Sequence, residues 1–239
     1  MTGFEKRDGS GYTLVELMIA LLLSMIAMVG MYKTFASFSA NSKTQEQLIA
    51  MNQDLRFGIG KMAKDIGDAG YNPKGVVSST IGILLAKPNT MKFTMDIDGG
   101  QSDGLDNDAD ATTDEADEAT YGNGAISGSF VNGSTEIIIY NRSAGDLKRN
   151  GQAVVSNIDA LNFVYLNSSG APTTTLASIV SVQITMVART PDKDFSYIHN
   201  ETYKNLQGTV VLGHQTSAST KNYRRRALTI DVNCKNLLY

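Results

Sequence analysis

The sequence holds few of the residues that build disulfides and histidine-based metal sites. Cys234 is the single cysteine among 239 residues, so no disulfide can form within the chain. We expect Cys234 to be a small buried hydrophobic residue. The two histidines, His199 and His214, lack the spacing of metal ligands, and we assign them no role.

The motifs of the common enzyme classes are also absent from the sequence. It contains no nucleophile elbow, phosphate-binding loop, HExxH motif or Cys/His cluster. Carboxylates are plentiful, but acid–base catalysis needs two of them in different environments, and a flexible run of acids does not provide these. We therefore predict that the protein is not an enzyme.

Basic residues are missing from one long stretch. No Lys or Arg lies between Lys92 and Arg142, whereas residues 96–118 form an acidic loop rich in Asp and Glu. Because the net charge of the whole chain is only −3, the remainder is mildly basic. Hydrophobic residues make up 42% and charged residues 19% of the chain, which is typical of a folded domain.

The N-terminal segment is expected to enter a membrane. Residues 1–11 are polar and include Lys6 and Arg7, and residues 17–31 carry no charge. An apolar helix over residues 12–32 has about the length that crosses a bilayer. The basic residues on its N-terminal side predict a cytoplasmic N-terminus and a C-terminal domain on the other side of the membrane.

The same helix is predicted to continue over residues 33–70 as an amphipathic segment. Its apolar residues recur three or four positions apart and form a one-sided stripe. Gly58 and Gly60 lower helix propensity and mark either a bend or a close approach of the backbone, and Gly70 ends the helix as a C-terminal cap. The stripe consists of Leu48, Met51, Leu55, Ile59, Met62, Ile66 and Ala69.

Residues 71–239 are predicted to form a β-rich head. Apolar runs with period-two alternation are separated by clusters of Asn, Gly, Ser and Pro, as expected for strands and turns. The predicted fold class is α+β, with the long N-terminal helix packed on a mainly antiparallel sheet. The predicted strands are Met91–Met95, Ser134–Tyr140, Ala160–Leu166, Ile179–Val187 and Arg226–Val232.

A short motif at the start of the apolar run resembles the processing site of type IV prepilins. In the sequence GYTLVELMI, Gly11 precedes the cut, the aromatic Tyr12 follows it, and Glu16 is the fifth residue after it. Phenylalanine is usual where this chain has Tyr12. The resemblance implies a pilin fold, removal of residues 1–11 by a prepilin peptidase, N-methylation of Tyr12, and assembly with other pilin subunits through the helix.

Glu16 is the residue to which the resemblance assigns a part in assembly. A carboxylate in the apolar part of a membrane helix is costly, so it usually has a partner. In the family that partner is the N-terminal amine of the neighbouring subunit, here the amine of Tyr12. The alternative is that Glu16, which is near the helix end, extends to the membrane surface.

A narrower resemblance links the chain to PilW-type minor pilins, which are related to the J-type minor pseudopilins of type II secretion. The similar segments are residues 53–56, 62–66, 69–71, 158–165 and 223–236, together with Gly170. The resemblance implies a single-pass inner-membrane subunit with a periplasmic head that primes pilus assembly or lies near the filament tip. A secretion pseudopilin and an adhesive, calcium-dependent tip module are the alternatives.

The acidic loop has the ligand spacing of a calcium site. Counted from Asp106, oxygen-bearing side chains fall at positions 1, 3, 5, 7, 9 and 12 of an EF-hand-like loop. Ala111 replaces the glycine usual at position 6, and no flanking helix pair is evident. The alternative is a solvated acidic loop without metal. The predicted ligands are Asp106, Asp108, Asp110, Thr112, Asp114 and Asp117.

Three consecutive arginines, Arg224, Arg225 and Arg226, are the one weak indication of nucleic-acid binding. Arginines beside a predicted strand more often form a solvated patch that protects the sheet edge. They could equally meet the acidic loop of a neighbouring subunit. We therefore expect no nucleic-acid partner.

Overall fold

The structure is a computed structural model that describes residues 12–73, 81–97, 112, 126 and 136–237. The chain divides into two compact units, residues 1–46 and residues 47–239. A helix, α1 (Leu14–Gly67), begins in the first unit and ends in the second. The long helix predicted from the sequence is therefore confirmed, with its ends two or three residues inside the predicted ones.

In the first unit, α1 exposes apolar side chains on all sides, and three of its hydroxyl groups form hydrogen bonds within the helix. The hydroxyl groups of Ser24, Thr34 and Thr44 each donate a hydrogen bond to the carbonyl four residues earlier, at 2.7, 3.0 and 3.1 Å. Such bonds satisfy these three hydroxyl donors without water. Among the described residues, α1 is the helix that is long and apolar enough to cross a membrane.

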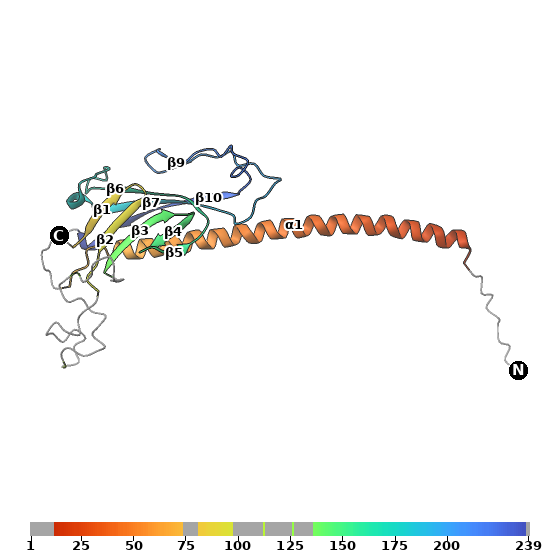
Figure 1. Cartoon of the computed structure of the whole chain (residues 1–239), viewed down its shortest axis with the longest axis horizontal. Helices are drawn as coiled ribbons and strands as arrows, with labels where there is room; N and C mark the ends of the chain where they lie inside the picture. The colour runs from red at the N-terminus through yellow and green to blue at the C-terminus, as the bar shows by residue number, and fades with distance from the viewer. Residues whose placement is uncertain (1–11, 74–80, 98–111, 113–125, 127–135, 238–239) are drawn as a thin grey trace. The chain divides into compact units, whose positions relative to one another are not determined.

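The second unit is built from antiparallel sheets that pack on the C-terminal part of α1 (Figure 1). The first sheet is a meander in which the neighbours are also consecutive in sequence. Its strands are β1 (Ile83–Lys87), β2 (Thr90–Thr94), β3 (Ile137–Ser143), β4 (Asp146–Arg149) and β5 (Gln152–Val155).

The second sheet has the order β10-β7-β6, and a small hairpin completes the strands of the described chain. The strands of the sheet are β6 (Ile158–Leu166), β7 (Ser181–Arg189) and β10 (Arg225–Asn233), and those of the hairpin are β8 (Tyr203–Lys204) and β9 (Val210–Leu212). Two short 3₁₀ helices complete the described elements: η4 (Leu176–Ser178) precedes β7, and η5 (Lys235–Leu237) follows β10. The predicted α+β class is confirmed.

The predicted apolar stripe of α1 forms the helix side of the core. Met51, Leu55 and Ile59 are each 3% exposed, and Met62 and Ile66 are fully buried. They pack against inward-facing residues of both large sheets. The largest buried partners on the sheets are Phe93, Tyr140, Met91, Ile138, Leu147, Ile158, Ile184 and Met186.

Gly58 lies where the helix comes closest to the sheets. A Cβ at this position would be 3.0 Å from the side chains of Met186 and Val155 and 3.2 Å from that of Leu147. Gly60, in contrast, has nothing within 4 Å of a Cβ. Of the two readings that the sequence left open for these glycines, close approach therefore applies to Gly58, and the sheets give no such reason for Gly60.

A buried carboxylate joins α1 to the first sheet. Asp65 accepts hydrogen bonds from the Arg149 guanidinium at 2.7 Å, the Tyr140 hydroxyl at 2.8 Å and the Lys61 ammonium at 3.1 Å. Burial by itself disfavours the charged carboxylate, but the bonds from Arg149, Tyr140 and Lys61 outweigh it, so the pKa of Asp65 is lowered. Removing one partner would leave a buried charge incompletely paired.

The chain leaves the helix through a turn that needs glycine. Gly70 has φ of +79°, and its amide donates to the carbonyl of Thr94 at 2.8 Å. The prediction that Gly70 ends the helix as a cap is therefore right only in part: Gly70 has the left-handed conformation, but the regular helix ends at Gly67 and the Gly70 amide bonds to β2 and not to a helix carbonyl. The turn is thus held against β2, whereas the next strand along the chain is β1.

Candidate processing and assembly segment

The N-terminus of α1 is capped by a reciprocal pair of hydrogen bonds between Thr13 and Glu16. The Glu16 carboxylate accepts from the Thr13 backbone amide at 2.9 Å and from its hydroxyl at 3.1 Å, and the Glu16 amide donates to the Thr13 hydroxyl at 3.3 Å. This is a capping box, in which each side chain satisfies a backbone donor that the helix leaves unpaired. Glu16 therefore has a partner within its own chain.

The predicted processing residues are described only in part. Gly11 and the predicted leader, residues 1–11, lie outside the described residues, so the structure does not test the cut. Tyr12 is the first described residue and is 91% exposed. It precedes the capping box directly, so the capped end of α1 and the predicted site of cleavage and methylation are adjacent in sequence.

The helix that follows is apolar and exposed in the single chain. Water does not solvate such a surface favourably, so it must be covered by lipid or by other protein chains. Aromatic residues continue the apolar surface at Tyr32, Phe35 and Phe38, which are 70–72% exposed. The segment is thus suited to a membrane or to packing against other helices.

The predicted calcium site lies almost entirely outside the described residues. Of its six predicted ligands only Thr112 is described; Asp106, Asp108, Asp110, Asp114 and Asp117 are not. Within the described ranges, no group of three or more His, Cys, Asp or Glu side chains is placed to hold a metal ion. The calcium prediction stays a prediction.

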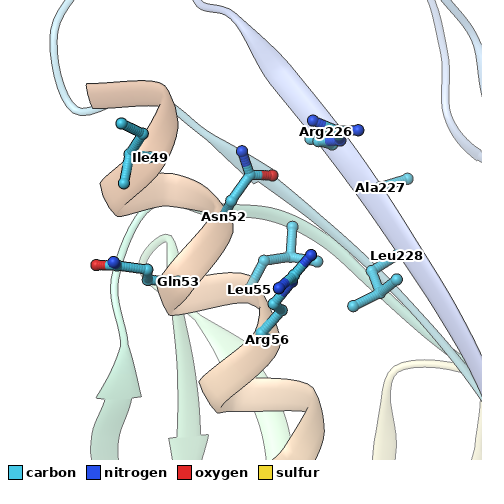
Figure 2. Close-up of a pocket in the computed structure, with 8 residues that line it drawn as sticks. All are labelled: Ile49, Asn52, Gln53, Leu55, Arg56, Arg226, Ala227 and Leu228. Carbon is cyan, nitrogen blue, oxygen red and sulfur yellow. The ribbon is translucent and has the colours of Figure 1, made fainter. Parts of the chain in front are cut away.

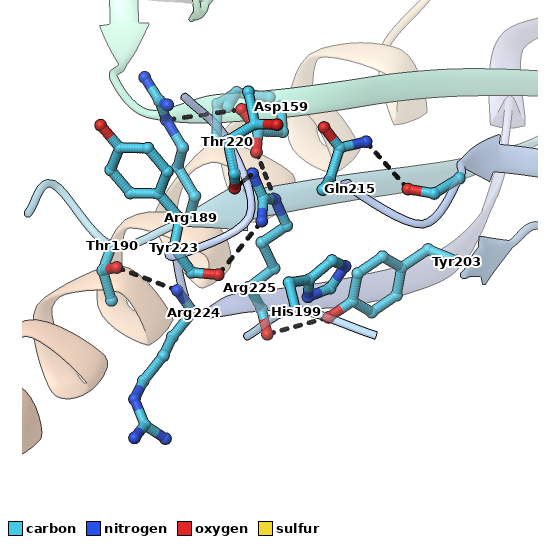
Figure 3. A network of polar contacts seen from close by, with 12 residues as sticks. Asp159, Arg189, Thr190, His199, Tyr203, Gln215, Thr220, Tyr223, Arg224 and Arg225 are labelled. Carbon is cyan, nitrogen blue, oxygen red and sulfur yellow. Dashed lines mark hydrogen bonds and ion pairs between the residues drawn. The ribbon is translucent and has the colours of Figure 1, made fainter. Parts of the chain in front are cut away.

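The three consecutive arginines have different environments, and Figure 3 shows two of them, Arg224 and Arg225. Arg225 is 8% exposed and donates to the Asp159 carboxylate at 2.6 Å. Arg224 pairs with Asp194 at 2.8 Å, and its guanidinium lies 4.6 Å from the centre of the Tyr197 ring. Arg226 is exposed and has no ion pair among the described residues. A continuous basic surface for phosphate is therefore not formed.

A buried histidine, to which the sequence assigned no role, lies beside this cluster. His199 is fully buried, and its ring stacks on that of Tyr203 with centroids 5.5 Å apart. The Nδ1 atom is 3.4 Å from the Tyr197 hydroxyl, and Nε2 has no hydrogen-bond partner in the described chain. Cys234 is fully buried as predicted, and burial raises the pKa of its thiol to about 12.

Comparisons with known proteins bear on the N-terminal segment. Residues 6–32 match the family model of the prokaryotic N-terminal methylation motif. No curated protein matches the chain. Among solved structures, a type IV-like pilin from Thermus thermophilus is similar at 10% sequence identity with a TM-score of 0.49, over 80% of this chain and 100% of that chain.

The family match covers both the predicted cut and the apolar run. In this segment the chain therefore carries the prokaryotic N-terminal methylation motif, as type IV prepilins do. The motif implies processing by a prepilin peptidase and assembly with pilins, and it indicates a structural subunit. The apolar helix that follows the motif fits a membrane-anchored pilin.

Proposed function

We propose that the protein is a minor pilin that takes part in the assembly or priming of a type IV pilus. The observation that carries the proposal is the methylation motif of residues 6–32 at the start of a 54-residue helix whose first part is apolar and exposed. Among the described residues of the head, the buried carboxylates of Asp65 and Asp159 bond to Arg149 and Arg225 and so hold the fold together.

In this proposal the N-terminal helix lies first in the membrane and then in the filament. The precursor is inserted with residues 12–32 across the inner membrane and with the head in the periplasm. Prepilin peptidase then cuts between Gly11 and Tyr12, and Tyr12 is N-methylated. The freed helix leaves the lipid and packs against the helices of other pilins, which cover the same apolar side chains.

The narrower assignment to PilW-type minor pilins is supported by where the similar segments lie. Residues 53–56 and 62–66 belong to the part of α1 that packs on the head, residues 69–71 to the turn after it, and residues 158–165 and 223–236 contain most of β6 and all of β10. β6 and β10 are two of the three strands of the second sheet. The resemblance therefore extends to the head and is not limited to the N-terminal anchor.

Mass spectrometry of the mature N-terminus tests the proposal. We expect chains recovered from membranes of a host with a prepilin peptidase to begin at Tyr12 and to carry one added methyl group. The same host without the peptidase is the control and should yield chains that retain residues 1–11. A cut after the apolar run, or a leader retained in both hosts, would contradict the proposal.

We further propose that the acidic loop binds calcium through the six ligands predicted from its spacing. The support is the oxygen spacing in the sequence and the lack of Lys or Arg between Lys92 and Arg142. Calorimetry of the full chain in detergent should show heat on titration with calcium, and the melting temperature should rise. The variant Asp108→Asn with Asp110→Asn should abolish both signals, and Asp146→Asn, in β4, is the matched control.

A further inference from the structure

One edge of the sheet β10-β7-β6 is unpaired in the described part of the chain. In an antiparallel pair, every second residue forms backbone hydrogen bonds with the neighbouring strand. The residues between them direct their N–H and C=O groups away from that strand. The amide of Thr190 donates to the Arg224 carbonyl at 2.9 Å, the amide of Cys234 donates to the Val180 carbonyl at 2.9 Å, and no bulge interrupts the ladder between them. Even-numbered residues of β10 therefore bond to β7, and odd-numbered residues face the edge.

Three of these odd-numbered residues form the open part of the edge. At one end the Arg225 carbonyl is occupied, because it accepts from the Tyr203 hydroxyl at 3.0 Å. At the other end the Asn233 carbonyl approaches α1 and lies 3.9 Å from the Cβ position of Gly67. Between them, the N–H and C=O groups of Ala227, Thr229 and Asp231 have no hydrogen-bond partner among the described residues. A strand added here would satisfy them.

A groove of about 460 Å³ lies between this edge and α1, and Figure 2 shows the two elements on its two sides. Leu228 of β10 and Leu55 and Ile49 of α1 give it an apolar lining. Ile49 is 58% exposed and Leu228 only half-buried, so both would gain by being covered. Side chains on one face of an added strand would enter this groove.

Two unpaired cations flank the groove. Arg56 and Arg226 both line it, and neither makes a hydrogen bond or ion pair with any described residue. The other arginines of the described chain all have a hydrogen-bond acceptor or an ion-pair partner: Arg142 the carbonyl of Ile158, Arg149 the carboxylate of Asp65, Arg189 and Arg225 that of Asp159, and Arg224 that of Asp194. The free positive charge of the described arginines is thus concentrated at one groove beside one open strand edge.

We propose that this edge and groove are a docking surface for an extended, acidic segment of another polypeptide. The segment adds to the sheet as a fourth strand beside β10 and bonds to the backbone of Ala227, Thr229 and Asp231. Its carboxylates lie against Arg56 and Arg226. Because Asp231 carries negative charge at the far end of the open edge, the acids of the partner are directed to the Arg226 end of the edge.

Hydrogen exchange with a synthetic probe tests the docking surface. The probe is a blocked peptide of alternating valine and threonine with two aspartates at one end, added to the full chain in detergent micelles. We expect the amides of Ala227, Thr229 and Asp231 to exchange more slowly with the peptide, whereas those of Leu228 and Ile230 are slow without it. A peptide with two lysines in place of the aspartates should bind about tenfold more weakly.

Two sets of variants separate the backbone contribution from the charge. Thr229→Pro removes an amide that faces the open edge, and Thr229→Ala is its control, since both lose the hydroxyl that bonds Thr185 at 3.0 Å. Binding should be lost in the first and kept in the second. Because proline could unfold the strand, Arg56→Glu with Arg226→Glu is the second set, and it should reverse the preference to the lysine peptide.

Three results would overturn the proposal. The first is unchanged exchange at Ala227, Thr229 and Asp231 with saturating peptide. The second is equal binding of the two peptides by the unmodified chain. The third is protection of the same three amides without peptide that increases with protein concentration, which would assign the edge to a second copy of the chain.

Discussion

At the scale of single residues, His199 combines complete burial with incomplete hydrogen bonding. Burial first, and then the nearby charge of Arg225, lower its pKa, whereas Glu201 acts in the opposite direction. The rings of Tyr197 and Tyr203 complete its surroundings. The neutral imidazole is therefore the form that the folded head accepts.

This burial predicts that the head loses stability in mild acid. The unfolded chain takes up a proton at His199 below about pH 6.5, whereas the folded chain resists it, so stability present above that pH is lost as the pH falls. Thermal unfolding followed between pH 7.5 and 5.5 should show a falling midpoint. His199→Gln should flatten this dependence, and His214→Gln is the control; equal slopes for both variants would show that His199 is not the cause.

Single residues also differ in whether their burial could be predicted from the sequence. Cys234 was predicted to be buried because a lone cysteine has few other uses, and it is buried. His199 carried no such signal, because its burial comes from Tyr203 and from the segment before β10, neither of which is marked by periodicity. The buried partners of Arg225 and Asp65 were missed for the same reason: Asp65 and Arg149 are 84 positions apart.

At the scale of elements, the start of α1 gives Glu16 two roles that substitutions can separate. Glutamine can take the place of glutamate in a capping box, so Glu16→Gln keeps the cap and removes the charge. Thr13→Ala removes the cap and keeps the charge. If Glu16 acts on the amine of a neighbouring subunit, incorporation into filaments should fall about tenfold or more in Glu16→Gln and little in Thr13→Ala.

The measurement is the ratio of the chain in sheared filaments to the chain in membranes, determined by immunoblot. Glu16→Ala, which removes both functions, sets the lower limit. A normal ratio in Glu16→Gln together with a low ratio in Thr13→Ala would show that the cap, and not the charge, is what assembly requires. The two single variants therefore give opposite results under the two explanations.

The elements differ in how well the sequence predicts them. α1 and strands β2, β3, β6, β7 and β10 were predicted with end shifts of a few residues, because long apolar periodicity dominates there. Strands β1, β4, β5, β8 and β9 were missed. They are two to five residues long, and β4, with the sequence DLKR, buries one side chain, so no alternation is visible.

At the scale of the whole molecule, the fold class followed from the order of one long helix and several strands, and the structure confirms it. The processing motif could also be recognised in the sequence, because its residues are contiguous and a peptidase that cuts at such a motif recognises a linear segment. The open edge of β10 was not predictable. Which strand is last in a sheet depends on pairing between segments far apart in sequence, and only Arg226 gave a hint of it.

The lone thiol gives the molecule a built-in reporter. Cys234 follows β10, is fully buried, and bonds through its amide to Val180. A thiol reagent can therefore label the chain only when this end of the sheet has opened, and there is no second cysteine to confuse the count. The rate of labelling therefore measures how fast the head opens, and it can be determined in detergent, in membranes or in a filament without any substitution.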